Sequence, residues 1–149
     1  METEAASITF DIPSIIALQK DYQETIEYIL AVMPDVNWNS QLETRQYFID
    51  EFNLLLHSQT IASLKNILAN IEQQEYIDEA DLCCEMLSGL IEIKKLQSVI
   101  RNYTGNILRH HKDGIYPLRQ VNGEWVMQNK QPLSYCPEIK ACIIAQQGV

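Results

Sequence analysis

The sequence lacks the long apolar runs that membrane proteins carry. No stretch reaches about eighteen consecutive apolar residues, the length that a membrane-spanning helix needs. The first residues, METEAASITFD, are acidic, whereas a secretory leader begins with basic residues followed by an apolar segment. From these two absences we expect a cytoplasmic protein that has no membrane partner.

Cysteines and catalytic motifs are also scarce. The four cysteines are the neighbours Cys83 and Cys84 and the pair Cys136 and Cys142, which follow neither a metal-ligand spacing nor a disulfide framework. The chain has no Gly-rich phosphate loop, no zinc-protease or serine-hydrolase motif and no aspartate pair suited to two magnesium ions. We therefore expect reduced, mostly buried thiols, no cofactor, no metal site and no enzymatic activity.

Length and apolar content predict the fold class. With 149 residues, of which 46% are apolar, the chain has enough apolar surface for one core. We expect a single domain, 1–149, that is mainly α. Residues 13–112 should form a bundle of four to five helices, and residues 113–149 should form a small C-terminal β-hairpin followed by an irregular tail.

Local signals divide the helical part. A frayed or strand-like lead-in should precede a helix that begins near Pro13 and ends at Pro34, and Trp38 in the connector should anchor packing. Ser40 and Glu43 have the capping-box spacing that starts a second helix. The apolar residues of these two helices that should face inward are Ile15, Ile16, Leu18, Tyr22, Ile26, Ile29, Leu30, Met33, Leu42, Tyr47, Phe48, Phe52, Leu55 and Leu56.

Two further helical segments follow. Thr60 can cap a short helix over 61–71, and residues 78–88 resume the helical pattern after a polar turn. Gly89 should either interrupt that pattern or let another backbone come close.

A long helix over 91–111 has one apolar stripe and several basic residues. The apolar residues recur at steps of three and four, which places them on one buried face. They are Ile93, Leu96, Ile100, Tyr103 and Ile107. Asn102 and Gly105 are poor helix formers, so the helix should loosen there.

Beyond this helix the pattern changes to β. The sequence HHKDG over 110–114 should end the helix, and its two histidines beside Asp113 are either a solvated helix end or a metal or base site. Asn122 and Gly123 readily take the positive backbone angles of a tight hairpin turn, so we expect strands on either side. A last short strand should lie at 142–145.

Charge is divided along the chain. Residues 1–88 carry 3 Lys and Arg against 16 Asp and Glu, a net charge of −13, whereas residues 89–149 carry 8 against 4, a net charge of +4. Such an asymmetry is a functional hint because packing does not require it. The basic segment can meet phosphates, which the acidic segment would repel.

The order of several short motifs resembles the thumb and first palm segment of family A DNA polymerases. NWNSQL at 37–42 stands where the family has an Asn-Ser opening before a Gln-Leu helix, and KLQSVIRNY at 95–103 is similar to its Lys-Leu-x-Ser helix. DGIYP at 113–117, the pair Arg119 and Gln120, and SYCPEIK at 134–140 follow in the family's order. The resemblance implies a polymerase-thumb-like fold.

The departures from this family matter for function. The family's Thr-Gly-Arg is replaced by EWV at 124–126, and its Pro-Asn-Leu-Gln is replaced by PEIK at 137–140, which removes polar groups that face the duplex in the family. The chain also stops before the palm segments with the metal-binding aspartates, so the resemblance implies no phosphoryl transfer.

Two functions from different classes remain open. In the first, the chain is a non-catalytic protein-interaction or regulatory subunit in nucleic-acid metabolism, whose partner is a polymerase or another nucleic-acid-handling protein. The candidate partner-binding residues are Glu75, Asp78, Glu79, Asp81 and Glu85. In the alternative, the basic helix binds duplex or primer-template DNA without reading its sequence. The candidate nucleic-acid-binding residues are Lys94, Lys95, Ser98, Arg101, Arg109, Lys112, Arg119 and Gln120. The sequence leaves the oligomeric state open.

Overall fold

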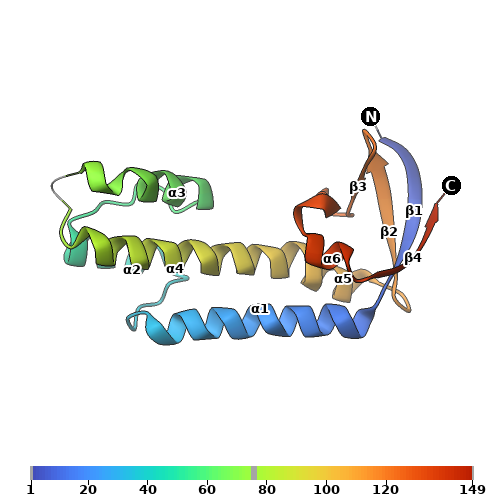
Figure 1. Cartoon of the computed structure of the whole chain (residues 1–149), viewed down its shortest axis with the longest axis horizontal. Coiled ribbons are helices and arrows are strands. Elements are labelled where there is room, and N and C mark those ends of the chain that lie inside the picture. The colour runs from blue at the N-terminus through green and yellow to red at the C-terminus, as the bar shows by residue number, and fades with distance from the viewer. Residues whose placement is uncertain (1, 75–76, 149) are drawn as a thin grey trace. The chain divides into compact units, whose positions relative to one another are not determined.

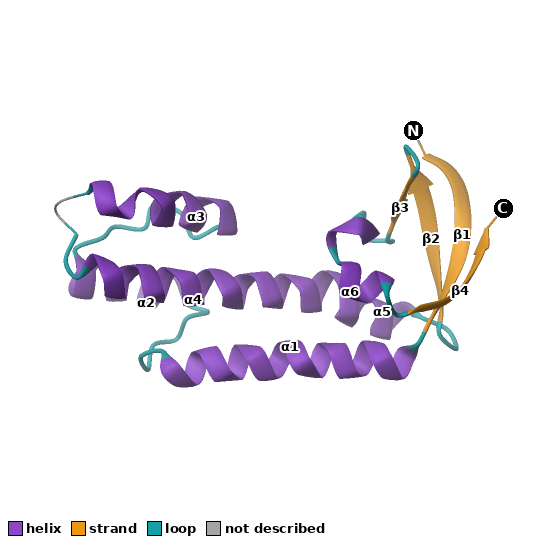
Figure 2. Ribbon diagram, in the orientation of Figure 1, coloured by secondary structure: helices purple, strands orange, loops and turns teal. Residues whose placement is uncertain are grey.

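Helices make up most of the chain, as the sequence predicts, and a small antiparallel sheet completes it (Figures 1 and 2). The computed structural model describes residues 2–74 and 77–148, with the side chains of 7–144 except that of residue 72. The helices are α1 (Ile12–Val32), α2 (Gln41–Phe52), α3 (Ile61–Asn70), α4 (Ala80–Val99), α5 (Gly105–His110) and α6 (Pro137–Lys140). The strands are β1 (Glu2–Phe10), β2 (Ile115–Val121), β3 (Glu124–Val126) and β4 (Ile143–Gly148).

The described residues form two compact units. Unit 1 consists of Met1–Glu24 and Leu96–Val149, and unit 2 consists of Thr25–Lys95. Helices α1 and α4 each contribute to both. The sequence predicts a different grouping, a helical part over 13–112 and a ribbon over 113–149, because a strand-like lead-in does not by itself indicate which strands it pairs with.

The sheet of unit 1 has the strand order β3-β2-β1-β4, with all neighbours antiparallel. The predicted hairpin of β2 and β3 is confirmed, since Asn122 and Gly123 turn it with φ of 51° and 81°. The sheet is nevertheless larger than a two-stranded ribbon. The strand-like lead-in is β1, which pairs with β2 on one side and β4 on the other.

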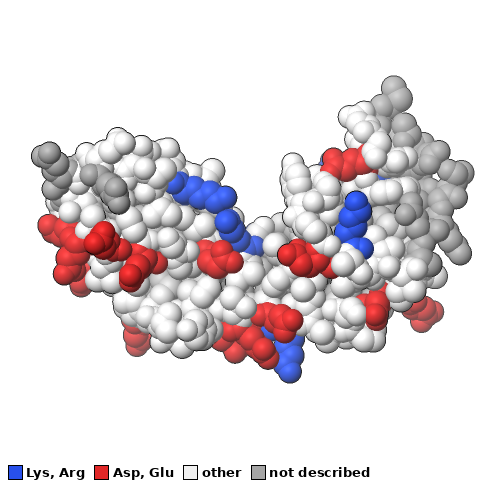
Figure 3. All heavy atoms as spheres, in the orientation of Figure 1, with Lys and Arg blue, Asp and Glu red and all other residues white. Residues whose placement is uncertain are grey.

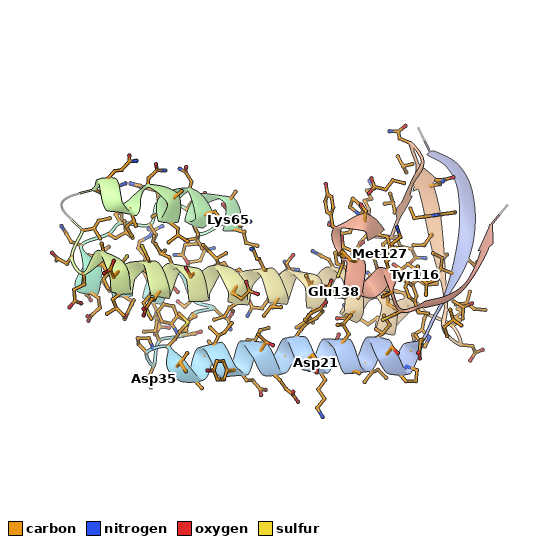
Figure 4. All side chains as sticks on the ribbon, in the orientation of Figure 1. Asp21, Asp35, Lys65, Tyr116, Met127 and Glu138 are labelled. Carbon is orange, nitrogen blue, oxygen red and sulfur yellow. The ribbon has the colours of Figure 1, made fainter. Side chains whose placement is uncertain are left out.

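One face of this sheet packs on the helices of unit 1. Ile8, Phe10, Tyr116 and Leu118 point from β1 and β2 into a core with Ile15 of α1, and their side chains are buried. Helix and loop residues complete this core, which includes Tyr103, Ile107, Met127, Leu133, Cys136 and Ile139. Figure 4 labels Tyr116 and Met127.

A π-helical turn, Ile100–Thr104, joins α4 to α5, so the helix loosens where the sequence predicts. The Gly105 N–H donates to the Ile100 carbonyl five residues back. The Asn102 carbonyl of this turn accepts a hydrogen bond from Asn129 Nδ2 at 2.8 Å. The buried Thr104 hydroxyl donates to Gln19 Oε1 of α1 at 2.8 Å. The loop over 127–132 and α1 thus stabilise the turn.

Unit 2 has its own core, in which aromatic rings predominate. Trp38 is 6% exposed, which confirms its predicted packing role, and its indole N–H donates to the Pro34 carbonyl at 3.2 Å. Tyr47 and Phe48 of α2 pair with its ring edge to face, and Phe52 packs on both of them, with ring centroids 5.1–6.3 Å apart in these pairs.

The predicted helix starts at Ser40 and Thr60 are confirmed, because both hydroxyls accept from amides three residues on. The capping box is only half formed. The Ser40 N–H donates to the Asn37 carbonyl at 3.0 Å, so the Glu43 carboxylate is not needed there.

Some expectations about buried positions are wrong. Leu42 is 75% exposed because α2 turns Thr44, Phe48 and Phe52 inward, a face roughly opposite Leu42 on the helix. The other residues predicted to face inward that are exposed are Ile16, Leu30 and Leu55.

Gly89 neither interrupts the helix nor meets a backbone. Helix α4 continues through it, and the atoms nearest to the position of an added Cβ are Met33 Sδ at 3.1 Å and Ile29 Cγ2 at 3.5 Å. The side chains of Ile29 of α1 and of Met33, just after α1, therefore lie next to Gly89, and no other backbone among the described residues does.

Candidate functional site

The eight predicted nucleic-acid-binding residues are divided between the two units. Lys94 and Lys95 belong to unit 2, and the other six belong to unit 1. The six are Ser98, Arg101, Arg109, Lys112, Arg119 and Gln120. The candidates therefore belong to two units, and each set is described by itself.

Two of the helical candidates are less available to a phosphate than the sequence suggests. Lys94 is half-buried, and desolvation lowers the pKa of its ammonium group. Ser98 accepts a hydrogen bond from Asn102 Nδ2 at 3.1 Å, one turn further along. Lys95 and Arg101 are exposed.

Arg101 lies within the π turn, and Arg109 and Lys112 follow it. A π turn adds one residue to the helix, which rotates all later side chains by about 100° relative to an uninterrupted α-helix. The angle of about 80° that α-helical spacing gives between Arg101 and Arg109 therefore does not apply across this turn. Arg109 is exposed, and its Nε donates to the Gly105 carbonyl of its own helix at 3.3 Å.

Arg119 and Gln120 point to opposite faces of the sheet. They are successive residues of β2, and side chains alternate along a strand. Arg119 pairs with Val126, whereas Gln120 pairs with Trp125, which packs against the unit 1 core. The structure thus separates two residues that the sequence places in one site.

The net charges of the two folded units differ from the net charges of the two sequence segments, 1–88 and 89–149. Unit 1 contains 7 Lys and Arg against 8 Asp and Glu, a net charge of −1, and unit 2 contains 4 against 12, a net charge of −8. The N-terminal segment brings five acids into unit 1, which offset the basic residues of the C-terminal part. Unit 1, which contains most of the basic C-terminal residues, is therefore close to neutral.

Four of the five predicted partner-binding acids lie around the start of α4. Asp78, Glu79, Asp81 and Glu85 are exposed, and none forms an ion pair with a described residue. Acidic side chains gather there on the face drawn in Figure 3. Glu75 lies outside the described residues. Asp81 also stabilises the first turn of α4, where the helix dipole favours a negative charge.

The two histidines end α5 in different environments. His110 is exposed, whereas His111 is half-buried and accepts a hydrogen bond at Nδ1 from the Gly114 N–H at 3.0 Å. His111 therefore closes the loop into β2. Over residues 2–74 and 77–148, no cluster of three or more His, Cys, Asp or Glu side chains has the arrangement of a metal site.

A groove that the sequence analysis did not predict lies along β2 and β3. It has a volume of about 840 Å³ and includes Arg119, the one predicted residue it shares. The lining residues are Pro117, Leu118, Arg119, Val121, Val126, Met127, Gln128 and Lys130. The alternation along β2 could have indicated an exposed face, but the groove also needs the loop over 127–130.

Several buried groups that ionise at alkaline pH lie in the two cores. Burial raises the pKa of the Cys83 thiol to about 12, and the neighbouring Cys84 adds to this shift. Burial also raises the pKa of the phenols of Tyr47, Tyr103 and Tyr116.

These shifts predict a loss of stability at alkaline pH. In the unfolded chain a thiol ionises near a pKa of about 8.5 and a phenol near about 10. A group whose pKa is raised by folding stabilises the fold below its unfolded pKa, and this contribution is lost as the pH rises through the folded pKa. We expect urea denaturation to show a free energy of unfolding that falls between about pH 9 and 12. The Cys83→Ala variant should lose part of the early fall, and Cys136 and Cys142, whose thiol pKa values burial also raises, should keep the rest. Constant stability across this range would contradict the prediction.

Comparisons with models of protein families, with curated proteins and with solved structures found no match. The resemblance to family A DNA polymerases therefore stays a prediction from the motifs. None of the helices in the described part is both long enough and apolar enough to cross a membrane.

Proposed function

We propose that the chain is a non-catalytic protein-interaction module, and that the acidic surface of unit 2 docks on a basic partner. One observation carries the proposal: unit 2 has a net charge of −8, and the exposed acids Asp78, Glu79, Asp81 and Glu85 have no described basic neighbour in ion-pair contact. A concentrated field of one sign steers and selects partners of the opposite sign.

The resemblance to a polymerase thumb supports a partner that works on nucleic acid, such as a polymerase. Direct binding of DNA has less support. The near-neutral charge of unit 1 would give a duplex little attraction, because phosphate binding depends on the number of cations that the protein brings to the backbone.

A charge-reversal series tests the proposal. A labelled peptide rich in lysine and arginine serves as the basic probe, and its affinity is measured by fluorescence anisotropy. Changing Asp78, Asp81 and Glu85 to lysine should weaken binding at least 10-fold, since three favourable charges become unfavourable. A matched control changes the exposed acids Glu27, Asp35 and Glu92 of unit 2 to lysine, which alters net charge equally. Equal losses in both variants would show a diffuse charge effect and would reject this docking face.

The DNA-binding alternative is tested on the same protein. A fluorescent primer-template duplex is titrated between about 50 and 200 mM salt, where phosphate contacts weaken steeply. Under our proposal the duplex binds weakly, and alanine at Lys94, Lys95 and Arg101 leaves its affinity unchanged. A loss of affinity together with a flatter salt dependence would favour the thumb-like function instead.

A further inference from the structure

The sheet of unit 1 has a second face, opposite its buried face. Because side chains alternate along β2, Ile115, Pro117 and Arg119 lie on the face opposite the buried Tyr116 and Leu118. Ile115 is 46% exposed. The register of β2 with β3 places Val126 beside Arg119 on this outer face.

The groove described above runs along this outer face and has two chemical parts. Its apolar walls come from Pro117, Val121 and Val126, and its lining also includes the buried Met127 (Figure 4). Its two charged residues, Arg119 and Lys130, are both basic and both exposed. No Asp or Glu is among the described residues that line it.

This composition selects among ligands. A volume of about 840 Å³ lies within the range of sites that bind small molecules or short peptides. Apolar walls favour a ligand with apolar side chains, and two cations favour one that also carries carboxylates. A nucleic-acid backbone would make no apolar contact with these walls, and its phosphates would need more than two cations for binding.

We propose that this groove binds a short, extended, acidic peptide segment of a partner protein, with apolar side chains against Val121 and Val126 and carboxylates near Arg119 and Lys130. The site has the opposite charge preference to the acidic surface of unit 2, lies in the other unit and does not depend on the function proposed for that surface. A partner with a basic surface and an acidic segment would use both.

The test uses the full-length protein and a fluorescein-labelled peptide in which glutamates alternate with leucines and valines. The peptide has about ten residues, which span roughly 34 Å when the chain is extended. We expect saturable binding that weakens about 10-fold in each of the variants Arg119→Glu and Lys130→Glu. The control Lys140→Glu makes the same charge change at an exposed residue outside the groove and should bind as the wild type does.

Chemical shift perturbation on the unmodified protein gives an independent readout that does not depend on how a variant folds. The peptide should shift amide resonances of β2, β3 and 127–130 more than those of α2 or α3. Equal affinity for a peptide with lysines in place of the glutamates would overturn the proposal. Shifts confined to residues outside the groove would also overturn it. A single-stranded oligonucleotide that binds in the groove, when the acidic peptide does not, would overturn it as well.

Discussion

Replacing Phe48 by alanine is expected to lower the free energy of unfolding of unit 2 by about 3–5 kcal/mol, the usual cost of removing a buried aromatic side chain. Phe48 is 0% exposed. Its ring lies 5.5 Å from that of Tyr47, 5.7 Å from that of Phe52 and 6.3 Å from that of Trp38. Removing it leaves a cavity among rings that cannot collapse without breaking their mutual contacts.

The two tryptophans allow this loss to be assigned to unit 2. Trp38 lies in the unit 2 core and Trp125 in unit 1, so a Trp125→Phe background leaves Trp38 as the only tryptophan. Urea denaturation followed by Trp38 fluorescence then measures unit 2 with and without Phe48→Ala.

Leu42→Ala is the matched control for this prediction. It removes an apolar side chain from the same helix, but Leu42 is 75% exposed, so stability should change by no more than about 0.5 kcal/mol. A comparable loss in both variants would contradict the burial pattern of α2.

The sequence predicts those parts of the fold that depend on neighbouring residues. Ser40, Thr60 and the Asn122-Gly123 turn act through hydrogen bonds and backbone angles within a few residues, so each is recognisable in the sequence and confirmed in the structure. The loosening near Asn102 and Gly105 is predicted from local helix propensity, although Gln19 and Asn129, distant in the sequence, stabilise the turn.

Pairing between distant segments is not predictable in this way. The N-terminal strand has an unremarkable composition, and its place between β2 and β4 depends on residues more than a hundred positions away. The same long-range pairing brings acids into unit 1 and nearly neutralises the basic residues on which the DNA-binding hypothesis rests.

The candidate site was only partly predictable for the same reason. The exposed acids near the start of α4 are adjacent in sequence, and four of them lie together in the structure. Arg119 and Gln120 are also adjacent, but strand alternation separates them. The groove combines Arg119 with Lys130 through a loop whose course no local pattern indicates.

Replacing Gly105 by alanine is expected to destabilise unit 1 by about 1–3 kcal/mol, although alanine is the better helix former by about 1 kcal/mol. Gly105 has ordinary helical backbone angles, with φ of −64°, so the cost is steric. An added Cβ would lie 2.6 Å from the Ile100 carbonyl oxygen, and backbone cannot move aside as a flexible side chain can.

No small structural change would relieve the clash with the Ile100 carbonyl. Converting the π turn to an α turn would rotate the following residues by about 100° and pull Ile107 out of the core and Asn106 away from the Tyr116 hydroxyl. The turn is also held from outside, by Gln19 on Thr104 and by Asn129 on the Asn102 carbonyl. The steric cost should therefore exceed the gain in helix propensity.

Gly89→Ala separates this steric effect from propensity. Gly89 is also helical, but its nearest neighbour is Met33 Sδ at 3.1 Å, near the end of a flexible side chain. We expect the Gly89→Ala variant to have a free energy of unfolding that is unchanged or higher by up to about 1 kcal/mol. Amide hydrogen exchange measures each unit separately, and exchange in β1 and β2 should accelerate in the Gly105 variant alone. Equal or greater protection of these strands in Gly105→Ala would mean that the π turn relaxes freely, and that the contacts of Gln19 and Asn129 do not hold it.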